Sequence, residues 1–223
     1  MGHLTLWTAA VDLTITLRSA LHIGTGLGLA QILDDRIVQG RHPLVEGADL
    51  PYIPGSSLKG RLRAHVRQLS ADLEWDLQQR TESEAHLFGF DDTPGSLVFA
   101  DAYLADLGLA RSLAETGGGL LPAVARSERS FVSLSRNRRV GLSGRLFRIE
   151  LADAGLAFVT QLRGSLPAES AERDMALLLA AARDLTHLGG HKGRGLGACS
   201  IAIGTIVLGD KQPTWSELRE VLR

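Results

Sequence analysis

The stretch Tyr52-Ile-Pro-Gly-Ser-Ser-Leu-Lys-Gly-Arg-Leu-Arg63 joins a turn containing proline and glycine to the start of a basic helix. Ser56 or Ser57 is expected to cap the first free backbone N–H groups of that helix. Apolar residues then recur at helical spacing, as Leu58, Leu62, Val66 and Leu69. This spacing predicts a helix over residues 56–69 with one buried face.

A second face of the same helix is positively charged: Lys59, Arg63 and Arg67 recur four residues apart along it, with Arg61 beside them. Cations in a first helical turn oppose the helix dipole, so local stability does not explain them. Free backbone N–H groups beside a cluster of cations form a site for an anion, and phosphate is the obvious candidate. The alternative is an ordinary solvated face, and the helix by itself supports both interpretations equally.

Composition indicates a protein of the cytoplasm with no membrane partner. The 223 residues are 44% hydrophobic, which is enough for a sizeable core and for one large domain or two small ones, and we expect one domain over residues 1–223. The single cysteine, Cys199, excludes an internal disulfide and favours a reducing compartment. The sequence contains neither a signal-peptide pattern nor an apolar run of roughly 20 residues, the length that spans a bilayer.

The net charge of -1 conceals two oppositely charged regions. Residues 70–115 contain ten acidic and two basic residues, whereas residues 120–149 contain seven arginines and one acidic residue. Because phosphate binding responds to the local charge and not to the sum, the neutral average does not exclude a nucleic-acid partner.

The order of the expected elements predicts an α+β fold with a ferredoxin-like or RRM-like sheet. Residues 112–147 are rich in arginine and contain Gly117-Gly-Gly119 near their start. This composition indicates a projecting hairpin or loop inserted into that fold. The expected strands are 10–19, 97–104, 146–151, 156–162 and 198–208, and the expected helices are 56–69, 169–187 and 215–222.

The loop Gly189-Gly-His-Lys-Gly-Arg-Gly-Leu-Gly197 is the strongest local signal for an anion site. Its five glycines let backbone N–H groups approach an anion closely, and His191, Lys192 and Arg194 add positive charge. It lacks the Gly-Lys-Ser/Thr ending of a P-loop, and a strand follows it instead of a helix, so a nucleotide-binding fingerprint is not indicated.

Two neighbouring aspartates, Asp34 and Asp35, lie in an irregular segment between glycine-bearing stretches. On composition alone, loop carboxylates are mostly solvated turn formers. A carboxylate held beside an RNA backbone could instead accept the proton of a 2′-hydroxyl, although the low pKa of aspartate predicts a slow reaction. The preceding Gly24–Gly28 loop carries no cation, and conformation is the simpler reason for its glycines.

Several other chemistries are not supported. The seven histidines show no metal-ligand spacing and Cys199 has no cysteine partner, so a structural zinc site is improbable. Aromatic residues make up 5% of the chain, which argues against base stacking on a sheet face and favours recognition of RNA backbone and shape.

Taken together, these motifs resemble the RAMP superfamily of CRISPR systems, and most of all the repeated backbone subunit of type III effector complexes. The matching stretches are spread over nearly the whole chain: Leu21-His-Ile-Gly24, Ile53–Arg63, Leu87-Phe-Gly89, Gly95–Ala102, Val132–Arg138, Leu146–Glu150 and Gly189–Gly197.

The resemblance implies an RRM-like palm with a thumb hairpin in the arginine-rich excursion. It further implies binding to CRISPR RNA and target RNA, stacking with further copies of the chain, and assembly with other type III subunits. Target RNA would be cut with a divalent metal such as Mg²⁺ that no dedicated protein cage holds. Asp34 matches the catalytic aspartate of the family, with Asp35 as the neighbouring candidate. The implied RNA contacts are Gly24, Ser56, Ser57, Lys59, Arg61, Arg63, Arg136, Arg138, Gly190, His191, Lys192, Gly193 and Arg194.

The chain departs from the family pattern in two places. Ser135-Arg136 stands where an Asp-Arg pair is usual at the base of the thumb, and Gly40–Asp49 is longer and more polar than expected. The main alternative is a non-catalytic backbone or capping subunit that only binds guide RNA. A stand-alone ribonuclease that processes guide RNA and a nucleotide-binding enzyme are more remote alternatives.

Overall fold

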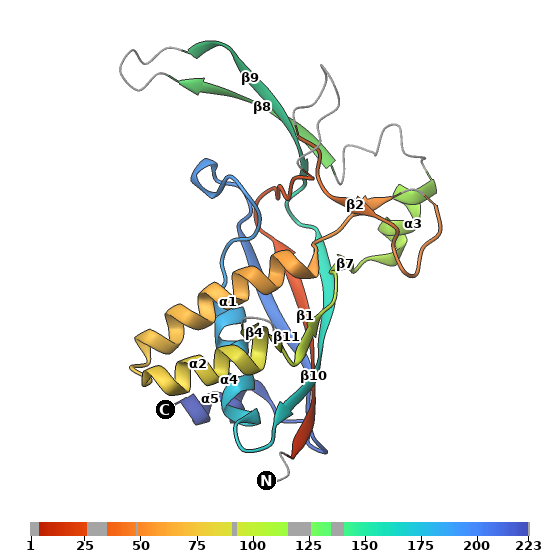
Figure 1. Ribbon diagram of the computed structural model, residues 1–223. Helices are drawn as coiled ribbons and strands as arrows, with labels where there is room; N and C mark the ends of the chain where they lie inside the picture. The colour runs from red at the N-terminus through yellow and green to blue at the C-terminus, as the bar shows by residue number, and fades with distance from the viewer. Residues whose placement is uncertain are drawn as a thin grey trace.

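The computed structural model describes residues 5–25, 35–47, 49–90, 93–115, 126–134 and 141–222. Figure 1 shows helices packed beside a twisted sheet, with a long hairpin projecting from the end opposite the two termini. The strands are β1 (Leu6–Leu17), β2 (Gln39–Gly40), β3 (Leu50–Pro51), β4 (Gly89–Phe90), β5 (Thr93–Pro94), β6 (Leu97–Phe99), β7 (Tyr103–Leu104), β8 (Arg126–Leu134), β9 (Gly141–Ala152), β10 (Ala157–Pro167) and β11 (Cys199–Leu208). The helices are α1 (Gly55–Asp72), α2 (Leu77–Phe88), α3 (Leu107–Glu115), α4 (Ala171–Asp184) and α5 (Trp215–Arg219), with short 3₁₀ turns η1 (Lys192–Arg194) and η2 (Glu220–Leu222).

The main sheet has the strand order β11-β1-β10-β6, with β7 also paired to β10, and every pairing is antiparallel. Counted along the core of the fold, this is fourth, first, third and second strand, the arrangement of a ferredoxin-like sheet. The predicted α+β, ferredoxin-like fold is therefore confirmed.

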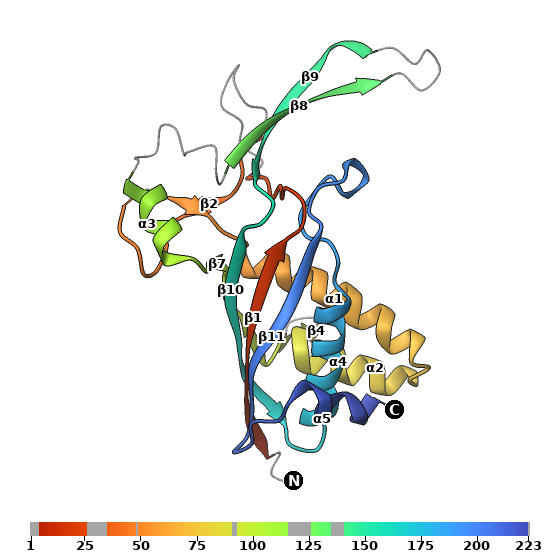
Figure 2. The same cartoon turned by 180° about the vertical axis from the view of Figure 1, so that it is seen from behind.

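The two faces of the sheet differ because side chains alternate along each strand. In β1, Val11, Leu13 and Ile15 are buried, while Asp12 between them is exposed. Helices α1, α2, α4 and α5 cover the buried face, as both Figure 1 and Figure 2 show. The opposite face of β1 presents threonines, Ala10 and Asp12, so it lacks the aromatic side chains on which an RRM stacks bases.

One predicted helix is shortened and one predicted strand is divided, because their backbones bond elsewhere. Helix α4 stops at Asp184, three residues before the predicted end, and residues 185–188 run in extended form beside the start of β11. There Leu188 donates to the Gly197 carbonyl at 2.9 Å. The predicted strand 97–104 is split into β6 and β7, since Ala102 between them exchanges backbone hydrogen bonds with Ile53 at 2.8 and 2.9 Å.

The described parts of residues 112–147, the region predicted as an excursion, belong to one helix and two strands. Residues 112–115 belong to helix α3, which buries Ala110, Leu113 and Ala114. The described residues of β8 and β9 pair in a separate two-stranded sheet that projects beyond the palm (Figure 2). Residues 146–151 were predicted as a strand, and they form the palm-side half of β9 in this hairpin. In the described part of the chain, no helix combines the length and apolar character needed to cross a bilayer.

Candidate nucleic-acid interface

His22 lies where three segments of the chain meet, just beyond the end of β1. Its ring is buried, with Nδ1 2.7 Å from the backbone oxygen of Glu150 in β9 and Nε2 3.1 Å from Oδ2 of Asp35. Backbone pairing holds these segments together, because Leu21 and Ala152 exchange hydrogen bonds of 2.8 Å. The fold thus joins the glycine turn after β1 to the base of the hairpin.

Asp35 is fixed through both its backbone and its side chain. Its backbone N–H donates to the Arg148 carbonyl at 3.4 Å, and its carbonyl accepts from the Glu150 N–H at 3.2 Å. The carboxylate also packs onto Gly24: a Cβ atom at position 24 would lie 2.1 Å from Asp35 Oδ2. A side chain at position 24 would therefore displace the Asp35 carboxylate from its present place.

Glu150 is the buried acidic residue of this junction. Its Oε2 accepts from the backbone N–H of Ile37 at 3.2 Å and from the amide of Gln39 at 3.3 Å. These bonds satisfy a carboxylate that is only 2% exposed, and they tie the segment after Asp35 to β9.

The glycine loop approaches the same junction from the other side. Gly190 donates its backbone N–H to the His22 carbonyl at 2.8 Å, and a Cβ atom at Gly189 would lie 2.3 Å from that same oxygen. The ring of His191 lies 5.4 Å, centroid to centroid, from the ring of His22. Residues 189–197, which are far from His22 in sequence, are thereby placed against it.

Arg194 links the glycine loop to the thumb-like hairpin, which β8 and β9 form. Its guanidinium carbon lies 4.9 Å from the ring centre of Phe131 in β8 and 4.8 Å from that of Phe147 in β9. Such cation–π contacts contribute about 0.5–1 kcal/mol each at exposed sites. The hairpin base and the glycine loop therefore form one composite surface, with the arginine held in place over the two rings.

His191 is neutral in this arrangement. Arg194 Nη1 lies 3.0 Å from His191 Nδ1, and because a guanidinium only donates, that ring nitrogen must accept. Burial lowers the pKa of His191, the positive charge of Arg194 and the neighbouring His22 lower it further, and Asp35 opposes them. The residue also has φ of 59°, an unusual backbone conformation for a non-glycine residue.

The glycines of this loop divide into two groups. Gly189, Gly195 and Gly197 have positive φ, and a Cβ atom at Gly197 would also collide with the Leu188 carbonyl. Gly190 and Gly193 have neither restriction, and around Gly193 an added Cβ atom would meet nothing within 4 Å. The described chain therefore gives no internal reason for glycine at these two positions, which face solvent.

The three cations at the start of α1 point to different neighbours. Lys59 Nζ lies 5.8 Å from the ring centre of Phe99, and Arg61 Nη2 lies 3.4 Å from the His187 carbonyl, next to the glycine loop. In the described structure Arg61 Nε is buried without a hydrogen-bond partner. Arg61 thus lies beside the glycine loop, and phosphate contacts by Lys59 and Arg61 stay predictions.

Arg63 turns away from the glycine loop toward α2. Its Nε lies 2.6 Å from Glu84 Oε1 and its Nη2 3.1 Å from the Gly89 carbonyl, and Arg67 also binds Glu84. Two arginines on one carboxylate stabilise the packing of α1 on α2. A phosphate contact by Arg63 stays a prediction, and it would have to compete with Glu84.

The predicted serine cap of α1 is wrong. Neither Ser56 nor Ser57 caps the helix through its side chain: the N-cap residue is Pro54, and Asp101 Oδ1 accepts from the Gly55 N–H at 2.7 Å. The Gly55 N–H, one of those expected to be free for a phosphate, is thus already bound by the Asp101 carboxylate. Ser56 is exposed and Ser57 half-buried.

Three predicted site residues, Asp34, Arg136 and Arg138, lie outside the residues that the structure describes. Exposed Lys192 belongs to η1, beside Arg194. Among the described residues, no three His, Cys, Asp or Glu side chains form a group that could hold a metal ion. The expected divalent cation therefore has no cage in the described part of the chain, and it stays a prediction.

Sequence reasoning missed His22, Glu150, Phe131 and Phe147. His22 and Glu150 fall within motifs already singled out, but their contacts join residues 128 positions apart. No local signal was available for Glu150: with Arg148 it alternates with Ile149 and Leu151, a pattern that predicts a carboxylate facing solvent.

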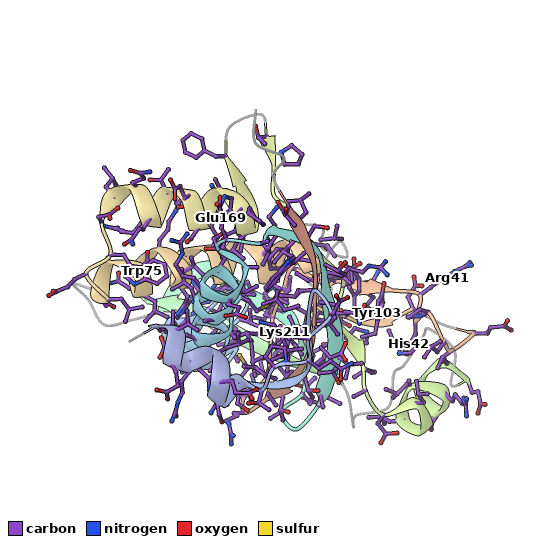
Figure 3. The ribbon with its side chains drawn as sticks, turned by 90° about the horizontal axis from the view of Figure 1, so that it is seen from below. Arg41, His42, Trp75, Tyr103, Glu169 and Lys211 are labelled. Carbon is purple, nitrogen blue, oxygen red and sulfur yellow. The ribbon has the colours of Figure 1, made fainter. Side chains whose placement is uncertain are left out.

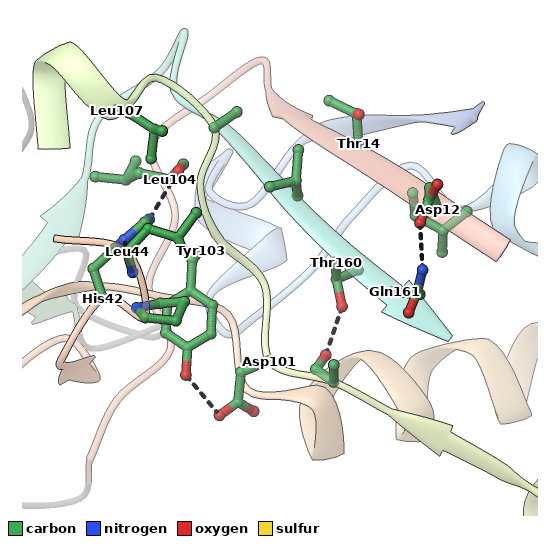
Figure 4. Close-up of a pocket in the computed structure, with 15 residues that line it drawn as sticks. Asp12, Thr14, His42, Leu44, Asp101, Tyr103, Leu104, Leu107, Thr160 and Gln161 are labelled. Atoms are coloured by element: carbon green, nitrogen blue, oxygen red, sulfur yellow. Dashed lines mark hydrogen bonds between the residues drawn. The ribbon is translucent and has the colours of Figure 1, made fainter. Parts of the chain in front are cut away.

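A separate apolar pocket of about 540 Å³ lies on the face of the main sheet opposite the helices (Figure 4). Tyr103 forms part of its wall, stacks on Tyr52 and meets the ring of His42 edge-on. Leu44 lines it too and is 70% exposed. Figure 3 places His42 and Tyr103 near α3, well away from Trp75 at the helical end. No residue of the glycine loop lines this pocket.

Comparison with known proteins gives a family match over most of the chain. The model of the RAMP superfamily matches residues 14–200. The CRISPR system Cms endoribonuclease Csm3 of Mycobacterium tuberculosis is 40% identical over 99 residues, 41% of this chain. The match spans 40% of the length of that relative.

Solved structures agree on the fold. One is a type III-B Cmr-beta complex bound to cognate target RNA, in which the similar chain has a TM-score of 0.58 and 14% identity. The match covers 87% of this chain and 96% of that one. A chain of the apo state of Cmr-beta has a TM-score of 0.57 and 15% identity, with the same coverage.

Proposed function

Because the chain belongs to the RAMP superfamily, we propose that it is a guide-RNA-binding backbone subunit of a type III CRISPR effector complex. Copies of it would stack along a CRISPR RNA with other subunits and cut the paired target RNA. The observation that carries the proposal is the junction at His22, where Gly190 bonds the backbone and Asp35 bonds the ring. A cationic glycine loop and Asp35 meet there.

The glycine loop supplies the proposed contact with the guide backbone. Lys192 and Arg194 are exposed, and Gly190 and Gly193 leave room for a ribose-phosphate strand to approach the chain. Arg61 would extend this contact toward α1, since it already reaches His187 at the entrance to the loop. Recognition of this kind reads phosphate and shape and is insensitive to base sequence.

Asp34 is the proposed catalytic residue, and Asp35 has a supporting role. The Asp35 carboxylate is engaged by His22 and packs onto Gly24, which favours a structural function for it. Asp34 would accept the proton of a target 2′-hydroxyl, whose oxygen attacks the adjacent phosphorus. The 5′-oxygen of the next nucleotide leaves and takes a proton from solvent, so the products are a 2′,3′-cyclic phosphate and a 5′-hydroxyl.

A divalent cation such as Mg²⁺ would offset negative charge on the phosphate that is cut. The described residues provide no cage for it, so no step is assigned to a protein-bound metal. We expect EDTA to stop target cleavage and to leave guide RNA bound.

The test uses the assembled complex with guide RNA and labelled target. Asp34→Ala is expected to bind target normally and leave it intact, while Asp35→Asn retains cleavage because its amide still hydrogen-bonds His22. Undiminished cleavage by Asp34→Ala would remove the catalytic assignment and leave a non-catalytic backbone or capping subunit. Failure of the chain to copurify with a discrete small RNA would reject the guide-binding role itself.

A further inference from the structure

We propose that Arg194 and His191, held against Phe131 and Phe147, form a stacking platform for one unpaired nucleobase of the bound RNA. This inference rests on the proposed function, because the base belongs to the strand that the glycine loop would hold. Sequence composition argues against base stacking on the face of the sheet. The platform lies elsewhere, between the glycine loop and the hairpin of β8 and β9.

The two phenylalanines are the floor of the platform. Phe131 and Phe147 lie directly opposite each other across the hairpin, with ring centres 5.7 Å apart and planes inclined by 25°. Both are half-buried. They pack against a small cluster of buried residues from the segment after β1, from β9 and from the glycine loop, namely Ala20, Ile149, Leu151 and Leu196. Packing therefore fixes the floor, as a preformed binding surface requires.

Two planar side chains of the glycine loop lie against this floor. The guanidinium carbon of Arg194 is almost equally distant from the two phenylalanine ring centres, at 4.9 and 4.8 Å. The ring of His191 is inclined by only 13° to that of Phe131, with the centres 6.2 Å apart. Its centre lies 6.3 Å from that of Phe147. The loop and the hairpin thus build one group of planar side chains from segments that lie far apart in sequence.

A hydrogen bond joins the two side chains of the loop. Arg194 Nη1 lies 3.0 Å from His191 Nδ1, and the lone pair of that nitrogen lies in the plane of the imidazole ring. The guanidinium therefore meets the imidazole at its edge and does not cover its face. Together they present a wider planar surface than either side chain does alone.

The exposure of Arg194 indicates a ligand, beyond a clasp between loop and hairpin. Arg194 is exposed to solvent although two aromatic rings hold it. A planar cation that is held on one face presents the other, and bases of single-stranded RNA stack on guanidinium planes as well as on aromatic rings. The neighbouring Gly193 has no side chain to cover that face, and an added Cβ atom there would meet nothing within 4 Å.

The platform divides the work of the loop between its two exposed cations. Arg194 would stack on the base, and Lys192, two positions before it, would meet the phosphate. Every base has a π face, so stacking of this kind tolerates any sequence. It does require that a base is present, and this requirement separates stacking from a purely electrostatic contact.

The test compares two single-stranded RNAs of equal length and charge, one with all its bases and one with a run of abasic nucleotides. The full-length chain is titrated with each fluorescently labelled RNA, and the anisotropy gives two dissociation constants. We expect wild type to bind the abasic RNA about five- to a hundredfold more weakly, the usual effect of losing a stacked base. Arg194→Lys keeps the charge and loses the planar group, so it should bind both RNAs with nearly equal affinity.

Two further variants act as controls. Lys192→Gln removes a charge and leaves the platform, so it should weaken the binding of both RNAs by the same factor and keep the preference for bases. Phe131→Leu keeps an apolar side chain in the hairpin and removes half of the floor, so the preference should fall. Thermal melting confirms that each variant is folded.

Equal binding of the two RNAs by wild type would overturn the platform and leave the proposed guide binding intact. The platform is also wrong if Arg194→Lys melts at a lower temperature but keeps the full preference for bases, because Arg194 then only clasps the loop to the hairpin. Binding of neither RNA, with no small RNA copurifying, would remove the proposed function and this inference with it.

Discussion

Asp101 Oδ1 lies 2.7 Å from the backbone nitrogen of Gly55 and so caps the N-terminus of α1 from a different strand segment. Residue 101 lies between β6 and β7, beside Ala102, which bonds Ile53. Two motifs that are 46 residues apart therefore form one structural unit. A carboxylate at this end of an 18-residue helix is also favoured by the helix dipole.

Asp101→Ala should lower the free energy of unfolding by about 0.5–2 kcal/mol, the usual loss when a helix cap is removed. Asp101→Asn retains an acceptor oxygen and should lose much less. Urea denaturation of the two variants measures the difference. Equal unfolding midpoints for Asp101→Ala and wild type would show that the cap is energetically unimportant.

Two glycines of α1 should respond oppositely to alanine. A Cβ atom at Gly55 would lie 2.0 Å from the Phe99 carbonyl, so Gly55→Ala should fail to fold stably. A Cβ atom at Gly60 meets nothing within 4 Å, and Gly60→Ala should stabilise the protein by about 0.5–1 kcal/mol through its higher helix propensity. Thermal melting checks both, and a destabilised Gly60→Ala would contradict the open environment of that position.

Glu84 should make the α1–α2 contact sensitive to acid. Burial acts to raise the pKa of Glu84, but hydrogen bonds from Arg67 and Arg63 outweigh it and the pKa is lowered. Its stabilising contribution is therefore complete above the pKa of the unfolded chain and is lost as pH falls through the lower folded value. Glu84→Gln should cost about 1–3 kcal/mol at neutral pH.

The same loss should shrink under acidic conditions, because protonated Glu84 in the wild type no longer pairs as a charge. Chemical denaturation of both proteins at neutral and acidic pH measures this difference. A difference that is independent of pH would indicate that the variant acts through packing.

Arg194→Gln should raise the pKa of His191, which can be followed by NMR titration of its ring protons. Burial is the first cause of the lowered pKa and is expected to remain, while the charge of Arg194, the second cause, is removed. The shift should therefore be partial. Arg194→Lys is the matched control, since it keeps the charge and loses the stacking on Phe131 and Phe147. An unchanged pKa in Arg194→Gln would show that the two side chains do not interact in solution.

Local patterns identified most of the palm. The alternation of Val11, Leu13 and Ile15 predicts β1 and its buried face, and the spacing of Leu58, Leu62 and Val66 predicts α1. These elements were predictable because the period of burial is set by backbone geometry within a few residues. The element order was sufficient for the ferredoxin-like strand order, since a right-handed crossover leaves few arrangements for two strand–helix–strand units.

The chemistry of the junction was decided by tertiary structure. The sequence by itself places glycines, cations and two aspartates in separate stretches, and it identifies the family they belong to. It does not show that Asp101 replaces the serines at the cap, that Glu84 holds Arg63, or that His22 faces Asp35. Each of these contacts joins residues that short-range periodicity leaves independent. Only the packing of strands and loops brings their donors and acceptors within hydrogen-bonding distance.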